Sequence, residues 1–277
     1  MIKGVKVTLL KNIFEKISSI TTSGIEVKSL SEDEVEVIVA EIKDLNPSEK
    51  EFIKNKLVEI SKGRSSSYDP DIIAKKIYDN LFRDDGTLKD SRIVSGFAAE
   101  FFLICILIDN GFEQQFCYKN LEENSAKKGF DGLYQMNEEI WLVESKSTQE
   151  EDSISHKTTI KRAYDGITDQ LAGKTKNDPW ENAANHARAF KSSDSLINKL
   201  EKLSTDYTSR NYKLLSECNL IIGSTIIHKN TSLGVSDSKK IDDYIGGHQV
   251  KNEKVVAMNL SEQDLFVEIM KEIANDK

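Results

Sequence analysis

Residues 91–112, SRIVSGFAAEFFLICILIDNGF, are the most apolar segment of the chain and constrain its fold more than any other. Apolar residues recur there at helical spacing and leave almost no polar face, which predicts a helix buried on most sides. Asn110-Gly111 indicates its C-terminal end. Such a helix needs a sheet or other helices around it, so the chain must build a layered core. Glu100 lies in the middle of this otherwise apolar segment.

Strand-like and helix-like segments alternate after this helix. Strands are predicted for the two runs within 129–146, for 219–228 and for 254–259. Helices are predicted for 160–173, for much of 180–203 and for 262–274. This order predicts an α/β protein with a mixed β-sheet core flanked by helices.

Residues 1–65 are predicted to form a small N-terminal α/β region. A strand is expected at 5–10, a helix at 12–20 and a hairpin at 25–43. Ser48 and Glu51 have the spacing of a capping box for the next helix. The serine-rich segment GRSSSYDPD that follows has the composition of a linker, so residues 66–277 are predicted as the second unit.

Composition excludes several classes of protein. No apolar run reaches the roughly 18 residues of a membrane span, and the N-terminus lacks a signal-peptide cleavage site. The three widely spaced cysteines are typical of a reduced, cytoplasmic protein. A net charge of −8 argues against an autonomous nucleic-acid binder, so any basic surface must be local or come from a partner. Basic residues are densest between 156 and 176, where phosphate contact is expected.

Residues 129–146, GFDGLYQMNEEIWLVESK, are predicted to form a hairpin centred on Asn137-Glu138. An even-length loop at that centre puts Asp131 directly opposite Glu144. Opposed residues share a face of the sheet, with Cβ atoms about 4.5–5.5 Å apart. Lys146 follows Glu144 by two residues, so it lies on the same face.

Two carboxylates this close repel each other. The repulsion is relieved either when the pKa of one carboxyl group is raised or when a divalent cation binds between them. Oxygen ligands select Mg²⁺ or Mn²⁺, and Mg²⁺ is commonly held by one or two carboxylates with waters and substrate phosphate. An ammonium such as that of Lys146 can orient a water or offset charge on a phosphoryl oxygen. We therefore expect Asp131 and Glu144 as metal ligands, with Glu100 completing the shell through water. The pattern predicts a phosphodiesterase site.

A surface strand pair is the competing interpretation, because Glu-x-Lys is common in a chain rich in both residues. The same spacing occurs at Glu26 and Lys28 and again at Glu41 and Lys43. Neither of these copies follows a long apolar helix, and neither has an aspartate on an adjacent strand. The combination with Asp131 favours a functional site at 144–146.

The order Asp131, twelve residues, Glu144-Ser145-Lys146 resembles the PD-(D/E)xK nuclease superfamily, with its restriction-endonuclease-like fold. Phe130 replaces the proline that often precedes the aspartate. The resemblance covers residues 91–175 and implies a metal-dependent nuclease. Some members carry a glutamine on the following helix, a place that Gln170 takes here, without the tyrosine of the RecB-like pattern.

Within this superfamily, the layout is most similar to the HamA nuclease subunits of the Hachiman anti-phage defence system. That resemblance implies DNA as substrate and a helicase partner resembling HamB. The residues themselves fit DNA and RNA equally. The alternative is a catalytically inactive restriction-like module that binds nucleic acid or protein. A nucleotide-binding enzyme is disfavoured, because no GxxxxGK[ST] or GxGxxG motif follows any predicted strand.

Overall fold

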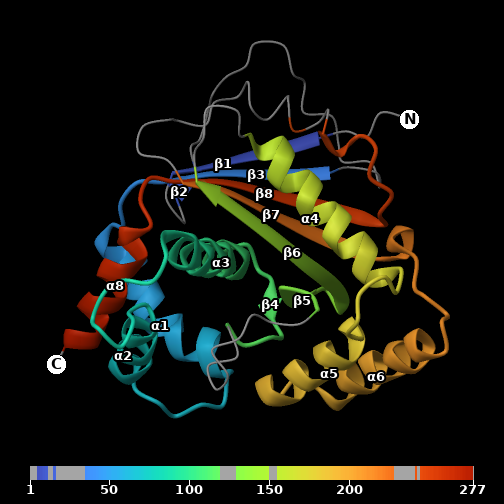
Figure 1. The fold of residues 1–277 in the computed structure, drawn as a ribbon, viewed down its shortest axis with the longest axis horizontal. Helices are drawn as coiled ribbons and strands as arrows, with labels where there is room; N and C mark the ends of the chain where they lie inside the picture. The colour runs from blue at the N-terminus through green and yellow to red at the C-terminus, as the bar shows by residue number, and fades with distance from the viewer. Residues whose placement is uncertain are drawn as a thin grey trace.

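The computed structural model describes residues 5–11, 15–16, 35–118, 129–149, 155–227, 241 and 244–276 (Figure 1). Its strands are β1 (Val5–Lys11), β2 (Glu15–Lys16), β3 (Val35–Ile42), β4 (Glu113–Gln114), β5 (Gly132–Met136), β6 (Glu139–Gln149), β7 (Asn219–Ile227) and β8 (Asn252–Leu260). Its helices are α1 (Pro47–Lys62), α2 (Pro70–Asn80), α3 (Ser91–Asp109), α4 (His156–Leu171), α5 (Pro179–Phe190), α6 (Asp194–Thr208) and α8 (Asp264–Asn275), with a short 3-10 turn at Leu215–Glu217.

The described strands form one mixed sheet in the order β2-β1-β3-β8-β7-β6-β5-β4. The pairs β1–β3, β3–β8, β8–β7 and β7–β6 in the middle of the sheet are parallel. The outer pairs β1–β2, β6–β5 and β5–β4 are antiparallel. The central strand β7 is buried along almost its whole length, as expected for a strand covered on both faces. The α/β class predicted from the sequence is confirmed.

Helices cover both faces of the sheet. Side chains of α1, α2, α3 and α8 share one hydrophobic cluster with one face of the strands. Side chains of α4, α5 and α6 share a second cluster with the opposite face. Figure 1 shows α3 and α4 on either side of β6. The sheet is therefore the middle layer of three.

Helix α3 is the buried core helix that its sequence predicts. The Asp90 side chain caps it by accepting from the Arg92 N–H, and every residue from Phe101 to Leu107 is buried. By length and composition alone α3 is apolar enough to cross a membrane, so the prediction that no apolar run reaches that length is wrong. Most of it is buried against the sheet and other helices, as in the core helix of a soluble protein.

The β5–β6 hairpin has the predicted register. Met136 pairs with Glu139 and Gly132 pairs with Val143, which leaves Asn137 and Glu138 as the two-residue turn. Both turn residues have positive φ, at 50° and 65°, as a type I′ turn requires. The turn therefore sets the register that the site depends on.

The N-terminal region shares the sheet and core of the rest of the chain. β3 lies between β1 and β8 and is parallel to both, and α1 packs in the same cluster as α3 and α8. The predicted division at residues 65 and 66 therefore does not separate two cores. Residues 25–30, the first strand of the expected hairpin, lie outside the described residues.

Two local predictions in this region need correction. The capping box of α1 is formed by Asn46 and Glu49, because Pro47 at the first helical position needs no N–H partner. Of the helix expected at 12–20, Glu15 and Lys16 instead pair with β1 as β2. The remaining residues of that segment lie outside the described part of the chain.

Candidate active site

The candidate site lies at the start of β5, where β6 continues past the last residue that pairs with β5. β5 pairs with β6 only as far as Gly132 and Val143, whereas β6 runs on to Gln149. One oxygen of the Asp131 carboxylate, Oδ2, accepts a 2.8 Å hydrogen bond from the backbone N–H of Ser145. The side chain of Asp131 thus takes the place of the next backbone acceptor along the ladder, which fixes its position beside Glu144.

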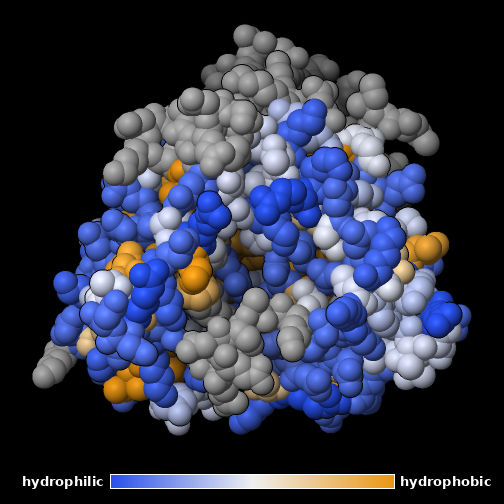
Figure 2. Space-filling view, in the orientation of Figure 1, coloured by the Kyte–Doolittle hydropathy of each residue, from blue (hydrophilic) through white to orange (hydrophobic). Residues whose placement is uncertain are grey.

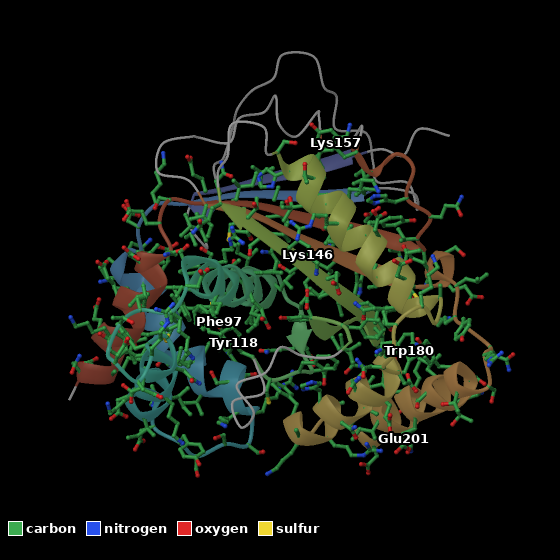
Figure 3. The ribbon with its side chains drawn as sticks, in the orientation of Figure 1. Phe97, Tyr118, Lys146, Lys157, Trp180 and Glu201 are labelled. Atoms are coloured by element: carbon green, nitrogen blue, oxygen red, sulfur yellow. The ribbon has the colours of Figure 1, made fainter. Side chains whose placement is uncertain are left out.

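Lys146 joins the two carboxylates. Its Nζ donates to Glu144 Oε1 at 2.6 Å and lies 3.7 Å from Asp131 Oδ2. It also donates to the backbone carbonyl of Ser145 at 3.0 Å. Figure 3 places Lys146 near the middle of the view, between α3 and α4. The structure therefore brings Asp131, Glu144 and Lys146 together at one point.

Burial makes the Glu144 carboxylate costly to ionise. Its side chain is 5% exposed, and its pKa is raised to about 7, first by burial and then by the charge of Asp131. Lys146 and Gln170 act in the opposite direction. Burial alone would lower the pKa of Lys146, but Asp131 and Glu144 outweigh it, so that pKa is raised. One ammonium thus compensates two carboxylates incompletely.

Helix α4 holds the other side of Glu144. Gln170 Nε2 donates to Glu144 Oε2 at 3.1 Å, so Gln170 reaches the site. One turn earlier, a Cβ at Gly166 would lie 3.3 Å from Glu144 Oε1. Glycine therefore allows the helix backbone to approach the carboxylate closely. Gly166 was not predicted from the sequence, although its position four residues before Gln170 was a usable signal.

Gln170 also presents an unused acceptor. Its side chain is buried, and Oε1 accepts from no donor among the described residues. Its backbone carbonyl accepts from the Tyr207 hydroxyl at 3.0 Å, which ties the end of α4 to α6. A buried acceptor of this kind needs a water or a ligand donor to be satisfied.

The expectation that Glu100 completes the shell through water stays a prediction. α3 packs on the face of the sheet that contains Tyr134, whereas Glu144 lies against α4 on the opposite face. The charge of Glu100 acts on Tyr118 and Tyr134, whose pKa values are raised chiefly by burial. In the part of the chain that the structure describes, no third histidine, cysteine or acidic residue joins Asp131 and Glu144 as a metal-binding group.

A buried polar cluster adjoins Lys146 on the next strand. Ser224 on β7 is the register partner of Lys146. Its Oγ lies 2.7 Å from His156 Nδ1 and also contacts Thr159 Oγ1, and His156 Nε2 lies 3.3 Å from Asn259 Oδ1. These contacts fasten the first turn of α4 to the sheet. His156 is therefore a buried anchor and not a surface phosphate contact.

The site opens onto one face of the molecule. Figure 2 shows a hollow near the middle of this face, bordered by hydrophilic residues, in the same part of the view as Lys146 in Figure 3. A cavity of about 360 Å³ between α1 and α8 and another of about 200 Å³ near the start of β6 and β7 lie elsewhere. Neither is lined by Asp131, Glu144 or Lys146.

The donor set fits a hard divalent cation. Two carboxylates face one ammonium, and Glu144 is left with a raised pKa that a second positive charge would relieve. Mg²⁺ or Mn²⁺ would be held by Asp131 and Glu144, with waters and substrate oxygens in the other positions.

Comparisons of this chain with protein-family models, with curated proteins and with solved structures found no match.

Proposed function

We propose that this chain is a metal-dependent nuclease of the PD-(D/E)xK type, with a restriction-endonuclease-like core, that hydrolyses DNA phosphodiester bonds. The observation that carries the proposal is the convergence of Asp131, Glu144 and Lys146 from two adjacent strands. The Glu-x-Lys copy at 41–43, which lies within the described residues, supplies a contrast. Glu41 and Lys43 form a 3.0 Å ion pair in which the Lys43 side chain is 58% exposed.

Each side chain has a distinct role in the proposed reaction. A bound Mg²⁺ or Mn²⁺ would supply Lewis-acid charge stabilisation for the phosphoryl group. Asp131 and Glu144 would hold that ion, and Lys146 would orient the attacking water and offset charge on a phosphoryl oxygen. Gln170 and Gly166 keep Glu144 in place from α4.

The cost of burying Glu144 favours catalysis over the inactive-module alternative. A carboxylate whose pKa is raised to about 7 destabilises the fold near neutral pH. A binding module would be more stable with an amide at that position. An unfavourable buried charge of this kind is common at active sites, where activity requires residues that lower the stability of the fold.

The proposed partner is a helicase resembling HamB, and the proposed setting is anti-phage defence in the cytoplasm. The chain has no nucleotide-binding loop of the GxxxxGK[ST] type, so energy from ATP would have to come from another subunit. The net charge of −8 is consistent with a nuclease that relies on a partner for part of its grip on DNA.

The test is degradation of plasmid and linear DNA by the purified chain with Mg²⁺ and with EDTA, with RNA of equal length in parallel. Lys146→Ala is the informative variant, and Lys43→Ala is its matched control from a Glu-x-Lys pair outside the site. We expect cleavage that needs metal, survives Lys43→Ala and falls at least about 100-fold in Lys146→Ala. Equal cleavage activity in Lys146→Ala and Lys43→Ala would show that the catalytic residues lie outside this site.

If the chain alone shows no cleavage, the same variants are tested together with a helicase resembling HamB. Cleavage that appears only in the complex and is lost in Lys146→Ala still supports the proposal. Absence of cleavage in the complex would favour the inactive-module alternative.

A further inference from the structure

We propose that Arg162 is the residue of this site that binds a substrate phosphate. The inference rests on the proposed function, since it names the group that would hold a nucleic-acid backbone next to Asp131, Glu144 and Lys146.

The first observation is the position of Arg162 on α4. Arg162, Gly166 and Gln170 are spaced four residues apart, so they line one side of the helix. Gln170 donates to Glu144 Oε2, and a Cβ at Gly166 would lie 3.3 Å from Glu144 Oε1. Arg162 therefore stands one turn before Gly166 on the side of the helix that faces the site.

The second observation is electrostatic. After burial and the two carboxylates, Arg162 is the next charge that acts on the pKa of Lys146, and it lowers that pKa. The charge of Arg162 therefore acts at the same site as that of Lys146. Lys146 itself forms ion pairs with Glu144 and Asp131, so its charge already compensates those two carboxylates.

The third observation separates Arg162 from the other basic residues around it. Lys161 forms a 2.5 Å ion pair with Asp165, and Lys174 forms a 2.8 Å ion pair with Asp169. Lys157 lies 5.4 Å from the centre of the Tyr244 ring. Arg162 is exposed and forms no ion pair or hydrogen bond with any described residue.

The chemistry of the guanidinium matches a phosphodiester. Arginine presents a planar fork of donors that binds two phosphate oxygens at once and stays charged at all working pH values. Arg162 also offsets the negative charge that Asp131 and Glu144 place at the site. An anionic strand approaching the two carboxylates would otherwise be repelled.

The experiment measures binding apart from cleavage. Fluorescence anisotropy of a labelled DNA duplex is recorded with the full chain in EDTA, across salt from about 50 to 200 mM. We expect Arg162→Ala to weaken binding about tenfold and to make the slope of log K against log salt about 0.9 shallower. Arg162→Lys keeps the positive charge but loses the forked donors of the guanidinium. Its affinity for DNA is expected to lie between those of the wild type and Arg162→Ala.

Lys161→Ala is the matched control, because it removes the same charge from the neighbouring residue of the same helix. Its salt slope and affinity are expected to stay near those of the wild type, since Lys161 already neutralises Asp165. Circular dichroism and thermal melting establish that each variant is folded.

The outcomes distinguish this inference from the proposed function. Equal losses in Arg162→Ala and Lys161→Ala, or no binding by the wild-type chain, would overturn the role of Arg162 even if the chain cleaves DNA. Binding that depends on Arg162 without any metal-dependent cleavage would leave the phosphate contact standing and overturn the nuclease.

Discussion

The side-chain amide of Gln170 donates a 3.1 Å hydrogen bond to Glu144 Oε2, although the two residues are 26 positions apart in the chain. This bond joins α4 to β6 at the one carboxylate whose pKa is raised to about 7. Because an amide donor favours the charged form of a carboxylate, Gln170 partly offsets the burial of Glu144. The helix therefore helps to set the protonation state of the strand residue.

Gln170→Ala should raise the pKa of Glu144 further in the metal-free protein, because the donor that lowers it is lost. The measurement is an NMR titration of the Glu144 carboxyl carbon in EDTA. Gln263→Ala is the control, since the Gln263 side chain accepts from Ser95 instead. An unchanged titration in Gln170→Ala would show that the bond does not form in solution.

The stability of the metal-free protein should depend on pH through Glu144. Its folded pKa of about 7 lies above the ordinary 4.5, so the folded state binds more protons between these values and stability falls as pH rises. From pH 5 to 8 the wild type should lose about 1–3 kcal/mol relative to Glu144→Gln. Urea unfolding at each pH measures the difference. Parallel pH profiles of the two proteins would contradict the raised pKa.

Gly166→Leu should destabilise the protein by about 1–3 kcal/mol and reduce metal-dependent cleavage, because its side chain would collide with Glu144 Oε1. Gly96→Leu is a matched control within α3, where an added Cβ meets nothing within 4 Å. That control should be neutral or slightly stabilising, since leucine favours helices more than glycine does. Thermal melting and the cleavage assay are the measurements, and equal behaviour of the two variants would place α4 farther from Glu144.

Ser224→Ala should cost about 1–3 kcal/mol, because it removes the buried hydroxyl that contacts His156 and Thr159. The melting temperature should drop by about 2–4 °C for each kcal/mol lost. Ser216→Ala, at an exposed position, is the control and should leave the melting temperature unchanged. A Ser224→Ala protein as stable as this control would show that the cluster does not anchor α4.

Local sequence signals identified much of the fold. The all-round apolar character of 91–109 predicted the buried helix α3, and the predominantly aliphatic segment 219–227 predicted the central strand β7. The register of β5 and β6 followed from the position of Asn137-Glu138, since a two-residue turn leaves only one way to pair the flanking strands. The approach of Asp131, Glu144 and Lys146 is a direct consequence of that register.

Long-range packing decided the rest. Residues 35–42 look like one half of a local hairpin, but their strand inserts between β1 and β8, which comes more than 200 residues later in the chain. Glu100 was expected near the carboxylates because it interrupts the apolar helix that precedes them. The face of the sheet that α3 covers is not encoded locally, and on that face the charge of Glu100 acts on Tyr118 and Tyr134.

The sequence by itself determined the parts of this protein that depend on spacing along one chain segment, namely the buried helix, the hairpin register and the shared face of Asp131, Glu144 and Lys146. The tertiary structure alone decided which side chains from α4 and β7 surround that face. Gly166 and Gln170 lie beside Glu144 because of the way α4 packs on the sheet, and Ser224 lies beside Lys146 because β7 pairs with β6. Both arrangements depend on contacts between segments that no local periodicity encodes.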